Sequence, residues 1–495
     1  MSTPLTLEPD YTDPHTLLAA VRELREEVYT EGITLYNRWR PRIQRREFRI
    51  SGLNLAYYLA LRKRDLRPLQ AALMPWGLSS LGRIEARVIP NLDAVIATLG
   101  AICGESIPHP RLSLFYRGQR LLRHQTNRVF GAPPARRVRI MVTMPSEAAH
   151  DAALVHDLLE HGMNCIRINC AHDTPDDWAS MIANLRRAEE RTGRRARVAM
   201  DLGGPKIRTE SVLTNGKRLK IGDTLLLTLQ PPDESLPFRF QAQCTLPQVF
   251  QQVQSGAEVW IDDGRIGGLV ETVDQHGLHL RVTHAGAEGE KLKAGKGINF
   301  PGTDLTLPAL TDDDLRDLPF IARHADIINY SFVQDASDMR RLQDALAEHL
   351  PHPERMAIVA KIETQRAIRN LPEIIVQAAG RQPFGVMIAR GDLAVEIGYQ
   401  RLAEMQEQIL WLCEAAHVPV IWATQVLENL VKKGRPSRAE MTDAAMAERA
   451  ECVMLNKGPY ILDAVTILDD VLRRMNAHQS KKTAQLRALR SWGEV

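Results

Sequence analysis

The sequence predicts an α/β protein: a (β/α)8 TIM barrel with an inserted β-rich lid domain and an N-terminal helical domain. Three observations lead to this fold. Short apolar runs rich in β-branched residues recur at roughly thirty-residue intervals from position 138 onward. Amphipathic helical segments fall between these runs, and one long insertion interrupts the alternation. A doubly wound sheet built from the same elements remains the structural alternative.

The alternation contains eight strand-like runs, and a helix-like segment follows each of them. The strand-like runs are residues 138–143, 164–169, 197–201, 326–332, 357–363, 384–390, 418–424 and 452–456. The helix-like segments are residues 146–162, 175–193, 311–325, 337–350, 364–380, 401–417, 438–451 and 461–475. Several of these segments begin with Ser, Thr or Asp, which are favourable N-cap residues. Eight such units are the number that closes a barrel.

The pattern of residues along the chain changes at four places, and these changes predict the domain boundaries. Residues 1–135 contain helical periodicity and form the expected N-terminal helical extension. Residues 136–205 and 305–475 form the expected barrel, and residues 206–304, with short runs bounded by Gly, Asp and Asn, form the inserted lid. An insertion after a barrel strand lies over the end where barrels carry their chemistry. Residues 476–495 are a polar, basic tail that we expect to fray.

Composition excludes several classes of protein. The 63 Lys and Arg residues nearly balance 60 Asp and Glu residues, and the net charge of +3 gives no reason to expect a nucleic-acid or membrane partner. The six cysteines show no metal-ligand spacing, which favours a reducing, cytoplasmic location. The arginine cluster in "YNRWRPRIQRREFRI" could contact phosphate, but a solvated or partner-facing surface is the favoured interpretation.

Charged residues stand at the carboxyl ends of several predicted strands, and in a barrel these ends converge on one rim. Glu363 and Asp392 follow neighbouring strands and could hold Mg²⁺ through one oxygen each. Lys361 lies two residues before Glu363, so both side chains point to the same face of an extended strand. The backbone N–H groups of Gly391 and Asp392 could bind a carboxylate or phosphate. This combination suits phosphoryl transfer or stabilisation of an enolate.

Several segments together resemble the pyruvate kinase family, in order and at the expected separations. These segments are "CIRINCAH", "DLGGPKIRTE", "VWIDDGRIG", "VAKIETQRAIRNLPEII", "VMIARGDLAVEIG" and "VPVIWATQVLENLVKKGRPSRAEMTDAA". The resemblance covers about residues 136 to 475. It implies a barrel with an inserted lid, phosphoenolpyruvate or pyruvate and ADP or ATP as small-molecule partners, Mg²⁺ as the cofactor, and a homo-oligomer.

The resemblance also implies roles for individual residues. Glu363 and Asp392 would bind Mg²⁺, and Lys361 would neutralise the phosphoryl group in transit, together with Arg167 and Arg208. The substrate carboxylate would be held by Gly391, Asp392 and Thr424, and Thr424 would help deliver a proton to the enolate carbon. The nucleotide would be bound by Lys296, Asp263, Asn169 and His172.

The chain departs from the family pattern in two places that affect chemistry. Family members that bind K⁺ use two hydroxyl side chains where this chain has Ala171 and Leu202, and a glutamate where it has Lys206. The Lys206 ammonium would substitute for the monovalent cation, so K⁺ is not expected. After the eighth strand, Asn456-Lys457-Gly458-Pro459 replaces the usual Ser-Gly-Glu-Thr. Two alternatives therefore stay open: a Mg²⁺-enolate enzyme for another 2-oxo acid, acting as a kinase or lyase, and a non-catalytic regulator that binds metabolite.

Overall fold

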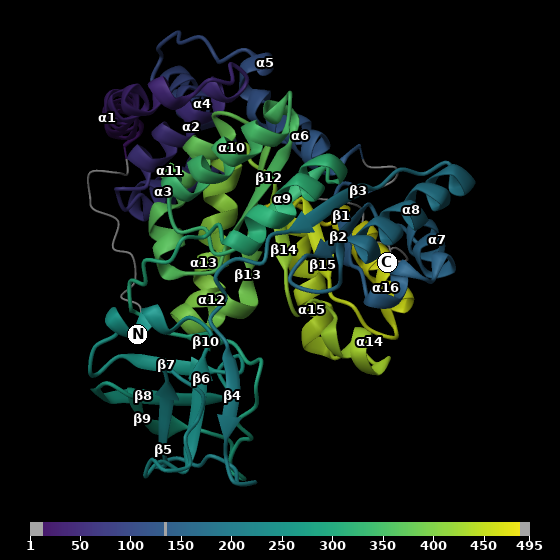
Figure 1. The fold of residues 1–495 in the computed structure, drawn as a ribbon. Helices are drawn as coiled ribbons and strands as arrows, with labels where there is room; N and C mark the ends of the chain where they lie inside the picture. Colours follow the sequence, from purple (N-terminus) through teal and green to yellow (C-terminus); the bar gives the residue numbers. More distant parts are fainter. Residues whose placement is uncertain (1–12, 133–135, 486–495) are drawn as a thin grey trace, which may run out of the picture.

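The computed structural model describes residues 13–132 and 136–485, and its centre is a closed barrel of eight parallel strands (Figure 1). The strand order is β1-β15-β14-β13-β12-β11-β3-β2. Closure excludes the doubly wound sheet, and the predicted fold class is confirmed. The strands are β1 (Arg139–Thr143), β2 (Cys165–Asn169), β3 (Arg197–Asp201), β11 (Ile327–Tyr330), β12 (Ala357–Ile362), β13 (Phe384–Ala389), β14 (Val420–Ala423) and β15 (Cys452–Leu455).

Helices surround the barrel because each crossover between parallel strands must cover the sheet. Four of these helices begin with a reciprocal capping box, for example Thr311 with Asp314 at the start of α9. There are two further helices: α12 follows β13 directly, and four residues separate α14 from β14. The helices are α7 (Ala152–Glu160), α8 (Pro175–Thr192), α9 (Asp312–His324), α10 (Ala336–His349), α11 (Gln365–Ala379), α12 (Arg390–Ile397), α13 (Tyr399–Ala415), α14 (Glu428–Lys433), α15 (Arg438–Met446) and α16 (Ile461–Asn476).

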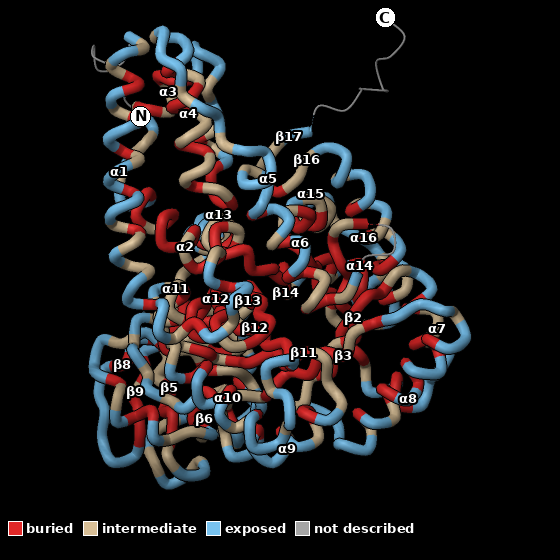
Figure 2. Tube along the Cα trace, turned by 90° about the horizontal axis from the view of Figure 1, so that it is seen from above, coloured by how far each residue is buried: buried red, intermediate tan, exposed pale blue. Residues whose placement is uncertain are grey.

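The barrel has an inner and an outer apolar core, because side chains alternate along each strand. Figure 2 shows buried residues concentrated in the strands and in the parts of the helices that face them. The inner core contains one or two residues from each strand, such as Met141 and Ile421. Val129 and Phe130, from an N-terminal helix, belong to this same buried cluster. The N-terminal region therefore closes the floor of the barrel.

The insertion between β3 and β11 is a separate seven-stranded sheet in the order β10-β7-β8-β9-β5-β6-β4, and Figure 1 shows it beside α12. It has its own buried cluster, which includes Phe240 and Phe300. Its residues therefore fold around a core that the barrel does not supply. The strands are β4 (Thr209–Leu213), β5 (Thr224–Thr228), β6 (Phe240–Cys244), β7 (Glu258–Ile261), β8 (Ile266–Val273), β9 (Gly277–His284) and β10 (Ile298–Asn299).

The N-terminal region is helical and is joined to the barrel by polar contacts. Its helices are α1 (Pro14–Trp39), α2 (Phe48–Leu61), α3 (Arg67–Leu73), α4 (Val88–Ile102), α5 (Leu112–Phe115) and α6 (Arg117–Phe130). Two arginines of the expected cluster point to the barrel: Arg42 pairs with Glu373 at 2.5 Å, and Arg45 donates to the carbonyl of Ala379 at 3.1 Å. This part of the cluster attaches one region of the protein to another, a role that differs from the solvated or partner-facing surface that we expected.

A buried histidine joins the N-terminal region to the end of α13. His417 is 2% exposed; its Nε2 lies 3.0 Å from the carbonyl oxygen of Ala86 and its Nδ1 lies 2.9 Å from Oγ of Ser51. Because a carbonyl only accepts, Nε2 carries the proton and Nδ1 accepts from the serine hydroxyl. Helix α6 approaches closely at Gly118, where an added Cβ would lie 1.8 Å from the Ala86 oxygen. Only glycine fits at this contact.

The described part of the tail differs from the frayed end that we expected. Strands β16 (Gln479–Ser480) and β17 (Thr483–Ala484) form a short hairpin. Lys481 at its tip pairs with Glu451 at 2.5 Å, and Lys482 pairs with Glu85. These ion pairs with the barrel and the N-terminal region hold a segment that its polar composition alone would leave free; residues 486–495 lie outside the described residues. Among the described residues, no helix is both long and apolar enough to cross a membrane.

Candidate active site

Lys361 lies at the centre of the carboxyl-end rim, between two acids. Its Nζ is 3.1 Å from Oε1 of Glu363 and 3.6 Å from Oδ2 of Asp201, and it donates to Oγ of Ser331 at 2.8 Å. Burial opposes the charge of this lysine, but the negative charges of Glu363 and Asp201 raise its pKa above the ordinary value. The site therefore holds a permanent ammonium at the end of β12.

Asp201 also binds a second cation, Arg167. The guanidinium donates from Nε and Nη2 to the two carboxylate oxygens at 3.0 and 2.7 Å, which is a bidentate pair, and from Nη1 to Oγ1 of Thr143 at 3.0 Å. Asn329 donates to Oδ1 of Asp201 at 2.6 Å. Although burial acts in the opposite direction, Arg167 and Lys361 hold the pKa of Asp201 below its usual value. Asp201 on β3 therefore fixes two cations, Arg167 from the adjacent β2 and Lys361 from β12, which lies two strands away on the other side.

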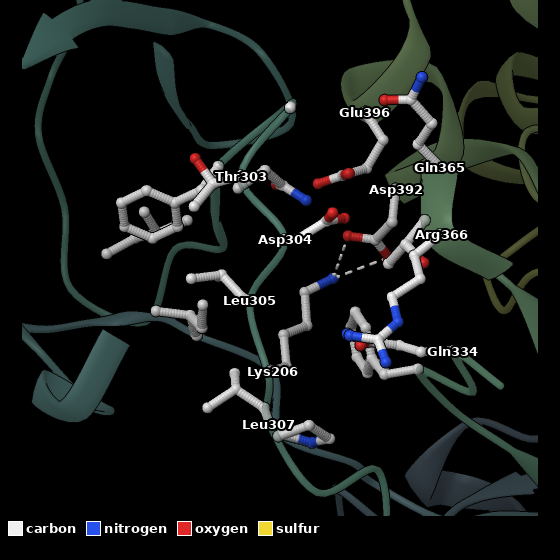
Figure 3. A pocket seen from close by; sticks show the side chains of 18 residues that line it. Lys206, Thr303, Asp304, Leu305, Leu307, Gln334, Gln365, Arg366, Asp392 and Glu396 are labelled. Carbon is white, nitrogen blue, oxygen red and sulfur yellow. Dashed lines mark hydrogen bonds and ion pairs between the residues drawn. The ribbon is translucent and has the colours of Figure 1, made fainter. Parts of the chain in front are cut away.

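The two predicted Mg²⁺ ligands lie near each other, and each is paired with a lysine. Glu363 is 2% exposed, and its Oε2 accepts from the N–H of Phe332 at 2.6 Å. Burial and the charge of Asp392 raise the pKa of Glu363, although Lys361 opposes this shift. Lys206 donates to both oxygens of Asp392, at 2.9 and 3.1 Å (Figure 3).

Two carboxylates whose charges act on each other fit a divalent cation, because hard oxygen donors are what Mg²⁺ prefers. A metal ion would relieve the repulsion that raises the pKa of Glu363. The donor set therefore fits Mg²⁺, provided that Lys206 releases Asp392 when the ion binds. In the structure the Lys206 ammonium thus lies against Asp392.

Thr424 follows β14 in a left-handed conformation, with φ of +61°. This is unfavourable for a β-branched residue, so the surrounding contacts must hold it. Arg390 supplies them: its Nη2 donates to the carbonyl of Thr424 at 2.6 Å, and it forms a bidentate pair with Asp443 at 2.5 and 2.9 Å. Arg390 is thus a buried support of the rim. Oγ1 of Thr424 accepts a hydrogen bond from the N–H of Gly391 at 3.0 Å. We expected this amide to be free for an anion, but in the structure it already has a partner.

Two of the three predicted residues of the lid have contacts within the lid. Lys296 pairs with Asp262 at 2.8 Å, and Arg208 donates to the carbonyl of Gly295 at 3.1 Å. Asp263 is exposed, with φ of +54°, in the turn between β7 and β8. No ion pair joins these three side chains to the barrel within the described residues.

A second part of the rim forms a cavity of about 260 Å³ beside Arg167. Asn169, His172 and Lys457 line it. Burial, together with the charges of Lys457 and Arg208, lowers the pKa of His172. The cavity therefore brings two predicted nucleotide-binding residues together with a lysine from the segment that departs from the family pattern.

Sequence reasoning gave no role to several residues that support this site. Asn329 was detectable, because it is a polar residue inside an apolar strand and lies two positions before Ser331, hence on the same face. Asp443 was not detectable, since it lies on α15 and meets Arg390 only through the fold. Glu396 lies one helical turn after Asp392, and both residues line a small cavity between the barrel and the lid that also contains Lys206 (Figure 3).

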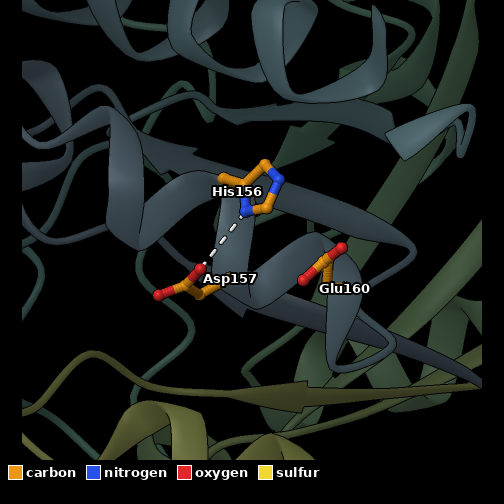
Figure 4. A group of neighbouring side chains, drawn as sticks. All are labelled: His156, Asp157 and Glu160. Carbon is orange, nitrogen blue, oxygen red and sulfur yellow. Dashed lines mark hydrogen bonds and ion pairs between the residues drawn. The ribbon is translucent and has the colours of Figure 1, made fainter. Parts of the chain in front are cut away.

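His156, Asp157 and Glu160 form a further group of possible metal ligands on α7 (Figure 4). Glu160 is exposed, and the other two side chains are half-buried. Nδ1 of His156 lies 3.2 Å from Oδ1 of Asp157. The group lies on α7, and nothing about it indicates a ligand beyond its composition.

Comparison with known proteins agrees with this geometry. The family model described as "Pyruvate kinase, barrel domain" matches residues 135–465. The chain is 32% identical to pyruvate kinase PKLR of Rattus norvegicus over 362 residues, which is 70% of this chain and 61% of that protein. It is 33% identical to the pyruvate kinase of Geobacillus stearothermophilus over 346 residues, or 68% of this chain and 57% of that protein. The chain thus spans less than two thirds of the length of these curated relatives. It belongs to the pyruvate kinase family.

Proposed function

We propose that this chain is a Mg²⁺-dependent, K⁺-independent phosphotransferase that moves a phosphoryl group from phosphoenolpyruvate to ADP and yields pyruvate and ATP. One observation carries the proposal: Lys361 is held between two buried acids on the rim, beside the Asp392 carboxylate. Membership of the pyruvate kinase family supports it, and so does the match of residues 135–465 to the family's barrel domain.

In this proposal the cations of the barrel stabilise charge on the transferring group. Lys361 and Arg167 are fixed by Asp201 before substrate arrives, so little reorganisation is needed when negative charge develops. Arg208 would join them from the lid. The charge of Arg208 contributes to the lowered pKa of His172 at the rim, which supports a role for the lid arginine on this side of the barrel.

Glu363 and Asp392 would hold the Mg²⁺ ion, which supplies a Lewis acid for the oxygens of substrate and enolate. Gly391, Asp392 and Thr424 would hold the substrate carboxylate. For this, the N–H of Gly391 must exchange the Thr424 hydroxyl for the ligand. Thr424 would then be free to deliver a proton to the enolate carbon, held in place by Arg390.

The nucleotide would lie between the lid and the second cavity. Lys296 and Asp263 would contact it from the lid, and Asn169 and His172 from the rim, where both line one cavity. Because burial and nearby cations lower the pKa of His172, this imidazole is neutral at pH 7 and can accept or donate a hydrogen bond.

Independence from K⁺ rests on Lys206. Its ammonium is a fixed positive charge within hydrogen-bond distance of Asp392, so it can replace a monovalent cation near the phosphoryl site. The expected cytoplasmic location and homo-oligomeric state stay predictions; all six cysteines are free thiols, in agreement with a reducing compartment.

The test is pyruvate formation by the purified chain from phosphoenolpyruvate, ADP and Mg²⁺, with either K⁺ or tetramethylammonium as the monovalent cation. We expect pyruvate at equal rates with the two cations, and none without Mg²⁺. A strict need for K⁺ would contradict the role of Lys206. Absence of pyruvate under all conditions would overturn the proposed reaction.

A second candidate is a Mg²⁺-enolate enzyme for another 2-oxo acid. The observation that favours it is Lys457, which adds a cation to the cavity beside Arg167. A panel of 2-oxo acids, tested for Mg²⁺-dependent exchange of the proton next to the carbonyl, separates the two candidates. Exchange with a longer 2-oxo acid and not with pyruvate would favour this alternative.

A further inference from the structure

A large basic cavity lies under the barrel floor, at the end opposite to the candidate active site. Its volume is about 700 Å³, which is within the range of small-molecule sites. It is enclosed by the 3-10 helix η5 (Glu85–Arg87), by α6, by the end of α13, by the start of β1 and by the β16–β17 hairpin. Its cationic lining residues are Arg83, Arg87, Arg120, Arg123, Arg137, Arg139, Lys481 and Lys482.

The carboxylates of the lining do not balance these eight cations. There are three of them: Glu85, which pairs with Lys482, Glu451, which pairs with Lys481, and Glu414. Burial raises the pKa of Glu414 to about 7, so this group is only partly ionised at neutral pH and compensates little positive charge. The cavity therefore has a net positive charge.

Several of the cations have no partner of opposite charge. Among the described residues, Arg83, Arg87 and Arg123 make no ion pair within 4.0 Å, and Arg120 donates only to the carbonyl of Ser113. These arginines come from two segments that are far apart along the chain from the hairpin lysines. Folding thus gathers like charges around one space, which is unfavourable unless an anion enters it.

Arg87 is the clearest case. Its Nε and Nη1 are buried and have no hydrogen-bond partner, and its guanidinium carbon lies 4.5 Å from the centre of the Phe115 ring. Burial lowers its pKa, in spite of the charge of Glu414. Burial of guanidinium N–H groups without acceptors is costly, and most buried polar groups in proteins have a partner. The aromatic contact holds the side chain in place but supplies no acceptor.

We propose that this cavity binds a small anion that carries two or more phosphate groups. One guanidinium group can donate two parallel hydrogen bonds to two oxygens of a phosphate group. An anion with several phosphate groups would reach arginines on both the η5 and the α6 sides of the cavity. The site is independent of the proposed phosphotransfer reaction, because it is built at the amino end of the strands. Water alone would solvate the exposed arginines but would leave the positive charge uncompensated.

The experiment is calorimetric titration of the full chain with sodium pyrophosphate, without divalent metal and at constant ionic strength. The cavity variant is R83Q/R123Q, which changes two exposed side chains that pair with no acid in the structure. The matched control R38Q/R111Q removes the same charge from exposed positions outside the cavity. A second control, R208Q/K296Q, removes the lid cations that would bind nucleotide phosphates. The melting temperature of each variant confirms its fold, and R123Q alone serves if the double variant unfolds.

We expect saturable binding of one pyrophosphate, weakened about tenfold or more in the cavity variant and unchanged in both controls, as loss of charge-assisted contacts requires. Inorganic phosphate should bind at least about tenfold more weakly than pyrophosphate, since it can reach fewer arginines at once. Equal weakening in R38Q/R111Q would reduce the effect to net charge and overturn the proposal. Weakening only in R208Q/K296Q would assign the anion to the other end of the barrel and would also overturn it.

Discussion

The two ends of the barrel treat charge in opposite ways. At the carboxyl ends of the strands, Lys361, Arg167 and Lys206 all contact acids, and Lys361 lies between two of them. At the amino ends, a neutral histidine joins the N-terminal helices to the barrel, and several arginines around the floor cavity, such as Arg83 and Arg87, make no ion pair among the described residues. The same eight strands thus carry a paired ionic site at one end and an attachment surface at the other.

This difference teaches which end determines activity and which determines stability. A preorganised set of paired charges lowers the barrier of a reaction without a large contribution to folding, since burial of ions offsets much of their attraction. Apolar and neutral polar contacts at the floor contribute to folding and do not meet the substrate. Substitutions at the rim should therefore alter turnover, and substitutions at the floor should alter unfolding.

The largest expected effect is that of K361M at the rim. Loss of the ammonium should lower kcat in the pyruvate assay by about 10³-fold, as for other preorganised groups that stabilise developing charge. The control K433M removes an exposed lysine at the end of α14 and should retain full activity. If K361M keeps more than a tenth of the turnover, the rim is not the catalytic end.

At the floor, His417 should make stability depend on pH. Burial lowers its pKa to about 4, from an ordinary 6.5, so between these values the unfolded chain binds a proton that the folded chain excludes. Its contribution is complete above pH 6.5 and is lost as the pH falls toward 4. This amounts to about 3 kcal/mol of unfolding free energy.

Urea unfolding at several pH values measures this term. The variant H417N, which tolerates the left-handed backbone at φ of +51°, should show a flatter pH dependence than the parent. Exposed His352 provides the control H352N, whose profile should match that of the parent. Turnover of H417N at neutral pH should be normal. A loss of activity without a change in the pH profile would reverse the roles of the two ends.

A smaller effect is expected for K206E, which restores the glutamate of K⁺-binding relatives. The variant should lose about tenfold to hundredfold of its rate in tetramethylammonium, because a carboxylate next to Asp392 adds repulsion where a cation stood. Added K⁺ should restore part of the rate. K206Q, which removes the charge without reversing it, should lie between the two. Equal rates for the parent, K206E and K206Q would show that Lys206 has no part in the reaction.

The smallest effect should come from the lid. Lys296 is half-exposed and pairs with Asp262, so K296Q should leave the unfolding free energy almost unchanged. Its KM for ADP should rise about tenfold, as expected for the loss of one charge-assisted phosphate contact, with a smaller change in kcat. The control K293Q removes an exposed lysine three residues away. An unchanged KM would remove Lys296 from the nucleotide site.

The sequence was sufficient for the barrel because strand and helix periods are local properties. Alternation at roughly thirty-residue intervals needs no knowledge of contacts, and the convergence of strand ends follows from the fold itself. For this reason Lys361 and Glu363 could be placed together before any coordinates. The hairpin at Gln479–Ala484 was missed because ion pairs with distant residues hold it, and its composition alone indicates a loose end.

Within the site, residue positions were easier to predict than side-chain partners. Arg390 stands at a strand end, like the functional residues, but its side chain points to Asp443 and supports Thr424. Lys206 was predicted to replace the monovalent cation, but its partner Asp392 was not predicted. Both outcomes depend on rotamers and on residues brought from another part of the chain, which spacing along one chain does not specify.

The insertion of the lid between two neighbouring strands has a consequence for folding. Asp201 on β3 and Asn329 on β11 form a hydrogen bond although they are 128 residues apart. If the intervening chain were unfolded, bringing these strands together would require closure of a long loop, which slows the formation of parallel pairs. Because the inserted sheet has its own apolar core, it can fold first and bring its two ends together. The folded lid then holds the ends of β3 and β11 near each other, so that these two strands can pair and close the barrel faster.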